Sequence, residues 1–134
     1  MPTEGKLAAV PRAGIFAQRN VPTCGLAEPV DTVRKRVQEE GWEECIVIDN
    51  ARVVLGRLQP QRLDSGSGAV VETVMEAAPS TIRPNTPLKT ALRRMQRGKT
   101  DSLLVTTSDG KLIGVLDRRS VEQGVDATAD ETKA

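Results

Sequence analysis

The hydrophobic and polar positions of the chain predict amphipathic helices that alternate with short strands. Apolar residues recur at helical spacing over residues 30–37 and 88–95. Each stretch follows a proline, Pro29 or Pro87, and proline is favoured at the first helical position. The pattern therefore predicts two helices that begin at these prolines.

Each predicted helix is followed by a hairpin. Gly41 and Gly98 are expected to end the helices, because glycine readily adopts the left-handed backbone found there. The Asp109-Gly110 pair is typical of a tight turn between two strands. The hairpin strands are predicted at residues 45–48 and 53–58, and at 103–106 and 112–116. A short strand before each helix and a short closing helix after each hairpin complete the order β-α-β-β-α.

The same order occurs twice because the chain contains an internal repeat. Residues 21–66 align without a gap on residues 79–124, an offset of 58 residues with nine identities in 46 positions. The apolar positions also coincide. A unit of about 45 residues buries too little surface to be stable alone. We therefore predict two units packed face to face about a pseudo-twofold axis, in the α+β class.

The repeat and the composition of its flanks predict the organisation of the chain. We expect a mobile N-terminal segment (1–14), a first motif (15–66), a second part (67–124) and a mobile C-terminal tail (125–134). The second part comprises a linker, a lead-in helix over residues 70–78 and the second motif.

Composition excludes several classes of function. The net charge is +1 and the only aromatic residues are Phe16 and Trp42, so neither a basic field nor a stacking surface for nucleic acid is predicted. Histidine is absent, and with it the commonest general base and metal ligand. Cys24 and Cys45 are predicted to be buried apolar residues on strands. No stretch is long enough to span a membrane, so a cytoplasmic location is expected.

The repeated unit resembles the cystathionine-β-synthase (CBS) motif, and the tandem arrangement resembles a CBS pair, or Bateman module. Residues 73–84 and 103–123 carry the resemblance in the second repeat, and residues 45–63 carry it in the first. The resemblance covers about residues 15–124. It implies a homodimer, and clefts between the motifs that hold an adenine nucleotide or a related ligand such as S-adenosylmethionine.

The resemblance also implies where a ligand would bind. The family pattern at the junction of strand and closing helix is glycine, two hydrophobic residues, Thr or Ser, two variable residues and Asp. Here Gln59 and Asp117 take the hydroxyl position, while Arg62 and Ser120 take the position of the ribose-binding Asp. The candidate ligand-binding residues are Thr23, Gly56, Arg57, Gln59, Arg62, Thr81, Gly114, Val115, Asp117 and Ser120.

Elementary electrostatics distinguishes the two junctions. Asp117 is interpreted as the N-cap of the closing helix rather than as a ligand group, and its charge would repel a phosphate. The first junction, with Gln59, Pro60, Arg57 and Arg62, suits a phosphate better. Arginines such as Arg57 and Arg62, expected at exposed strand and helix positions, are however more often solvated surface residues.

Two functions follow as hypotheses. The first is a non-enzymatic regulatory module that senses an adenosyl ligand and controls a partner whose identity the sequence does not indicate. The alternative is a structural dimerisation or interaction module whose clefts have degenerated. An enzyme is not expected, because no nucleophile, base and orienting group can be assembled from these residues.

Overall fold

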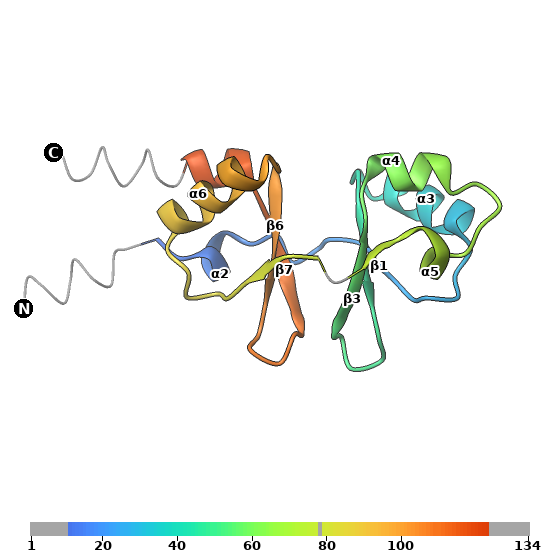
Figure 1. Ribbon diagram of the computed structural model, residues 1–134, viewed down its shortest axis with the longest axis horizontal. Coiled ribbons are helices and arrows are strands. Elements are labelled where there is room, and N and C mark those ends of the chain that lie inside the picture. Colours follow the sequence, from blue (N-terminus) through green and yellow to red (C-terminus); the bar gives the residue numbers. More distant parts are fainter. Residues whose placement is uncertain (1–10, 78, 124–134) are drawn as a thin grey trace, which may run out of the picture.

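The computed structural model describes residues 11–77 and 79–123, which form two halves, each a small sheet with helices packed on it (Figure 1). The first half contains β1 (Thr23–Cys24), α3 (Val30–Glu39), β2 (Cys45–Ile48), β3 (Val54–Leu58), α4 (Pro60–Ser65), α5 (Val71–Val74) and β4 (Glu76–Ala77). The second contains β5 (Thr81–Ile82), α6 (Leu88–Gly98), β6 (Ser102–Thr106), β7 (Leu112–Asp117) and helical residues 118–123. The α+β class and the repeated β-α-β-β-α order are confirmed.

The three strands that each motif contributes have the same topology and register in the two sheets. The first has the order β1-β2-β3-β4 and the second the order β5-β6-β7. The first strand of each motif is parallel to the next, and the hairpin strands are antiparallel. Thr23 faces Ile46 in the first sheet, and Thr81 faces Leu104 in the second, so the 58-residue offset relates the pairing.

Three groups of buried side chains hold the molecule together. Each half has its own core, built on α3 and β2 in the first half and on α6 and β6 in the second. A third group lies between the halves: Val21, Ile46, Leu104, Leu112 and Val115. The hairpin turns also pair, since the amide of Val54 donates to Gly110 O at 2.9 Å and that of Leu112 to Arg52 O at 2.9 Å. These two bonds are related by the repeat, which gives the expected pseudo-twofold arrangement.

The segments that precede each motif differ from the prediction. The helix expected over residues 70–78 is only the four-residue α5, and it is followed by β4, which pairs antiparallel with β3. A helix needs long-range support at this length, and here the sheet edge offers stronger pairing than a further turn of helix. Ala78 lies outside the described residues.

The N-terminal segment repeats this arrangement on the other half. Helix α2 (Ala13–Phe16) lies 58 residues before α5, and Gln18 pairs with Val115 of β7. In Figure 1 the blue α2 accordingly lies beside β7 and α6. Ala13 is fully buried in the core of the second half, a contact that the expected mobile segment over residues 1–14 did not include. Residues 1–10 and the expected tail at 125–134 lie outside the described residues.

Two glycines shared by the repeats allow these segments to cross the strands. A Cβ on Gly114 would lie 2.6 Å from Gln18 O, and one on Gly56 would lie 2.9 Å from Glu76 O. Real Cβ atoms do not approach backbone oxygens so closely. Both glycines are therefore required by the close approach of a neighbouring backbone.

The helix ends differ from the expectation by one residue. Pro29 and Pro87 are N-caps with extended backbone (φ −66°, ψ 137° and φ −62°, ψ 144°), and their carbonyls accept the first helical hydrogen bonds. Gly41 adopts the left-handed conformation after α3 with φ 74°. Gly98, in contrast, is still helical, and Lys99 takes the left-handed position with φ 53°. Within residues 11–77 and 79–123, no helix is long and apolar enough to cross a membrane.

Candidate functional site

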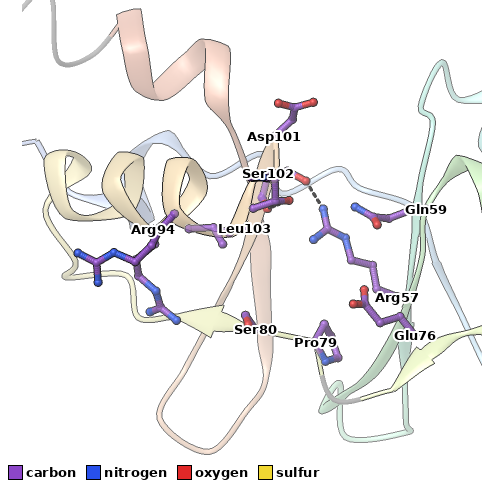
Figure 2. Close-up of a pocket in the computed structure, with 13 residues that line it drawn as sticks. Arg57, Gln59, Glu76, Pro79, Ser80, Arg94, Asp101, Ser102 and Leu103 are labelled. Carbon is purple, nitrogen blue, oxygen red and sulfur yellow. Dashed lines mark hydrogen bonds between the residues drawn. The ribbon is translucent and has the colours of Figure 1, made fainter.

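A cleft of about 660 Å³, here cleft 1, opens between the two halves (Figure 2). Its walls come from the end of β3, from β4 and the segment after it, and from the region between α6 and β6. The lining residues are Arg57, Gln59, Glu76, Pro79, Ser80, Arg94, Arg97, Gly98, Lys99, Thr100, Asp101, Ser102 and Leu103. Both halves therefore contribute to one concave site.

A second cleft of about 1080 Å³, here cleft 2, is the pseudo-symmetric counterpart of cleft 1. Its lining residues are Gln18, Asn20, Glu40, Gly41, Trp42, Glu43, Glu44, Asp101, Val115, Asp117, Arg118, Arg119 and Glu122. At the 58-residue offset, Gly41 stands where cleft 1 has Lys99, and Val115 stands where cleft 1 has Arg57. The backbone is thus duplicated while the side chains are not.

The two clefts carry opposite charge. Four basic and two acidic residues line cleft 1, whereas two basic and six acidic residues line cleft 2. Charges that line a concave surface act together, since the protein walls concentrate their field in the cleft. An anion is therefore attracted to cleft 1 and repelled from cleft 2.

Lys99 occupies a backbone conformation that a lysine rarely adopts. Its φ of 53° is in the left-handed region, where the counterpart Gly41 has φ 74°. A side chain with a Cβ pays roughly 1–2 kcal/mol there, and a glycine does not. A strained residue in a cleft points to a role for its side chain, and the ammonium of Lys99 adds positive charge to cleft 1.

Arg94 and its counterpart Arg36 share a structural contact but differ in charge pairing. Each guanidinium donates to the carbonyl of a first-strand threonine, Thr81 at 3.4 Å and Thr23 at 3.0 Å. Arg36 also forms an ion pair with Glu28 at 2.6 Å, and this hydrogen bond holds the pKa of Glu28 below its usual value. Thr86 stands at the matching position of the second half, so the charge of Arg94 is not offset there.

Arg57 is buried at the boundary between the clefts. Its Nε donates to Glu44 Oε1 at 2.6 Å and its Nη2 donates to Ser102 Oγ, as Figure 2 shows for Ser102. The hydroxyl of Ser102 donates in turn to Glu44 Oε2 at 3.3 Å. The side chains of Arg57 and Glu44 are only 6% and 14% exposed. The pair joins the lining of cleft 1, through Arg57, to that of cleft 2, through Glu44.

The structure brings only some of the candidate ligand-binding residues together. Arg57 and Gln59 line cleft 1, and Val115 and Asp117 line cleft 2. The other candidates do not line either cleft: Thr23, Gly56, Arg62, Thr81, Gly114 and Ser120. Gly56 and Gly114 serve the strand crossings described above.

Two of these candidates have specific structural contacts. Arg62 is exposed and donates to Val74 O at 3.0 Å, away from cleft 1. Asp117 Oδ1 accepts the amide of Ser120 at 2.7 Å, and its Oδ2 accepts from Gln18 Nε2 at 2.7 Å. The interpretation of Asp117 as a helix N-cap is confirmed. Both of its oxygens are already engaged.

The sequence did not assign to a ligand site the basic residues of α6 and its C-terminus, which are Arg94, Arg97 and Lys99. They precede the second hairpin, whereas the family pattern concerns the residues after it. Matching residues 40–44 to 98–102 would have shown the difference, because Glu40 and Gly41 align with Gly98 and Lys99.

Cys24 and Cys45 are buried in the core of the first half, as predicted. A hydrogen bond with Cys24, together with burial, raises the pKa of the Cys45 thiol far above its usual value. Cys45 therefore remains a protonated thiol, an apolar packing residue without nucleophilic character.

Comparisons with known proteins identify the repeated unit. Residues 71–123 match the family model of the CBS domain. The crystal structure of CBSX2 in complex with AMP is 25% identical and superposes with a TM-score of 0.79, covering 88% of this chain and 98% of that one. CBSX2 from Arabidopsis thaliana, a CBS-pair protein, is 24% identical with a TM-score of 0.75, covering 92% and 97% of the two chains.

A curated relative shares part of its length with this chain. An inosine-5′-monophosphate dehydrogenase of Korarchaeum cryptofilum (strain OPF8) is 30% identical over 128 residues. The match covers 92% of this chain but spans only 27% of that relative. The internal repeat, the fold and the CBS match agree with one another. Residues 71–123 thus match a CBS domain, and the described chain as a whole has the fold of a tandem CBS pair.

Proposed function

We propose that this CBS pair is a regulatory module that binds an adenine nucleotide of the AMP class in cleft 1. The opposite charge of the two clefts carries this proposal. Cleft 1 presents Arg94, Arg97 and Lys99 to the space between the halves, while the charge of Arg57 is offset by Glu44. Charge-assisted hydrogen bonds to phosphate are among the strongest that a protein makes.

The same charges favour a nucleotide over S-adenosylmethionine. The phosphate of AMP is dianionic near neutral pH, whereas S-adenosylmethionine carries a sulfonium cation and no phosphate. Cleft 1 therefore selects AMP. The six acidic residues of cleft 2 repel a phosphate. The Asp117 carboxylate also caps the N-terminus of the helix over residues 118–123, where a phosphate would otherwise bind. We expect one nucleotide per chain.

Binding in cleft 1 gives a regulatory rather than a catalytic role. The cleft is built from β3 and β4 of the first half and from α6 and β6 of the second, so a ligand there bridges the halves. A ligand that binds only the folded state stabilises it by RT ln(1 + [L]/Kd). Occupancy thereby changes how firmly the two halves are held together.

The likeness to CBSX2 supports this assignment, because that protein was crystallised in complex with AMP and its chain matches at 25% identity along almost its whole length. In this chain the affinity would come from α6 and Lys99, because Arg62 and Ser120 replace the ribose-binding carboxylate of the family pattern.

Calorimetric titration with AMP, adenosine and S-adenosylmethionine tests the proposal. We expect AMP to bind more tightly than the other two. Lys99→Gly, which installs the residue of the opposite half, should weaken AMP binding about 3- to 10-fold by loss of one charge. The same change should leave the melting temperature unchanged or raise it, because it relieves the backbone strain.

Arg93→Gln is the matched control, since Arg93 is an exposed residue of α6 that does not line cleft 1. It should leave AMP affinity unchanged. If the unmodified protein takes up no AMP at millimolar concentration, the structural interaction module is the better description of the chain.

A further inference from the structure

Arg57, Glu44 and Ser102 form a closed hydrogen-bonded group in which each residue contacts the other two. Arg57 and Glu44 belong to the first half, and Ser102 belongs to β6 of the second. In Figure 2 the Arg57 side chain extends from β3 toward Ser102, across the boundary between the halves. Its guanidinium is thus fixed from both sides.

The two contacts leave part of the guanidinium available. An arginine has five N–H donors, and here the Nε and one Nη2 hydrogen are used. No described residue accepts a hydrogen bond from Nη1 of Arg57, and no buried side-chain nitrogen or oxygen among the described residues lacks a partner. Nη1 is therefore not fully enclosed by protein, and the cleft that Arg57 lines is cleft 1.

From this geometry we infer that Glu44 and Ser102 are positioning residues, which hold Arg57 so that its remaining donors meet the phosphate of a nucleotide in cleft 1. The inference rests on the proposed function. A long side chain that is already ordered loses less entropy when it binds a ligand. Glu44 also offsets the arginine charge, so Arg57 contributes mainly geometry while Arg94, Arg97 and Lys99 contribute attraction.

The opposite half lacks such a group. At the 58-residue offset, Val115 takes the place of Arg57. Ser102 takes the place of Glu44, and Glu44 takes the place of Ser102. Replacing Arg57 by Val and Glu44 by Ser would therefore introduce residues that the matching positions of the other half already accommodate. This double variant provides a background in which Ser102 has no arginine to position.

The test is titration of the full chain with AMP and with adenosine, by calorimetry, in five proteins: the unmodified protein, two Ser102 variants, and the double variant with and without Ser102→Ala. We expect Ser102→Ala to weaken AMP binding about 3- to 10-fold, because Arg57 loses one of its two anchors. Adenosine has no phosphate and should bind the variant as it binds the unmodified protein. Ser102→Thr keeps the hydroxyl and should restore AMP affinity. In the Arg57→Val/Glu44→Ser background, Ser102→Ala should have no further effect.

Three outcomes overturn the inference. The first is AMP binding that Ser102→Ala leaves unchanged, and the second is an equal loss for AMP and adenosine, which a structural disturbance would cause. The third is a loss that persists in the double-variant background. In each of these cases the unmodified protein still binds AMP and the proposed function stands, whereas an unmodified protein that binds no AMP overturns both.

Discussion

The Arg57–Glu44 ion pair predicts opposite effects of a single and a double substitution on stability. Arg57→Val alone leaves the Glu44 carboxylate, 14% exposed, without its cation. Breaking a buried ion pair in this way costs about 3–5 kcal/mol, because the remaining charge is desolvated and uncompensated. A domain of this size has a free energy of unfolding of about 5–15 kcal/mol, so the single variant should lose a large part of it.

The double variant Arg57→Val/Glu44→Ser removes both charges. Replacing a buried pair by well-packed residues is often neutral or stabilising by about 1–4 kcal/mol. The structure favours this result, because Val115 and Ser102 are buried at the matching positions. Chemical denaturation with urea, followed by circular dichroism, measures both variants. If the double variant is as unstable as the single one, or if the single variant loses less than about 1 kcal/mol, the ion pair does not act as a buried pair.

Further predictions concern the backbone, a second ion pair and assembly. Gly114→Ala should destabilise the fold by at least about 2 kcal/mol in urea denaturation, because its Cβ would lie 2.6 Å from Gln18 O. Arg52→Gly should raise the melting temperature by relieving about 1 kcal/mol at φ 66°. The hydrogen bond with Arg36 lowers the pKa of Glu28 in the folded protein. The Glu28–Arg36 pair therefore stabilises the fold above the pKa of Glu28 in the unfolded chain, and this stabilisation is lost as pH falls through the lower pKa of the folded state. Glu28→Gln should flatten the loss of stability below about pH 4 in acid titrations. Light scattering should give twice the monomer mass, and a monomer at high micromolar concentration would contradict the proposed homodimer.

Much of the fold could be predicted because the repeat supplied each element twice. The hairpin of residues 103–116 has a clear turn signal at Asp109-Gly110, and the alignment transfers it to Arg52, whose backbone adopts the same left-handed conformation. The crossing segments could not be predicted in this way. Residues 13–18 and 71–76 have no identical position, and their conformation depends on sheet edges that are distant in sequence.

The candidate site was predicted less well, for a physical reason. The family pattern locates residues by their place in the motif, but a cleft between two motifs is lined by different segments of each. Arg57 and Lys99 meet in cleft 1 only because the halves pack about a pseudo-twofold axis. The net positive charge of cleft 1 and the net negative charge of cleft 2 depend on that packing and not on either motif alone.

The pairing of Gln18 with Val115 has a consequence for how the chain folds. The first half is contiguous over residues 21–77, whereas the second is assembled from residues 11–18 and 79–123. In the sequence, the first half is therefore inserted between the two segments of the second. During synthesis the first half can form as it emerges, while residues 11–18, which emerge before it, must wait for β7. Contacts of such long sequence separation slow folding. Because the second half is completed only by a segment that precedes the first half in sequence, the two should unfold in a single cooperative transition.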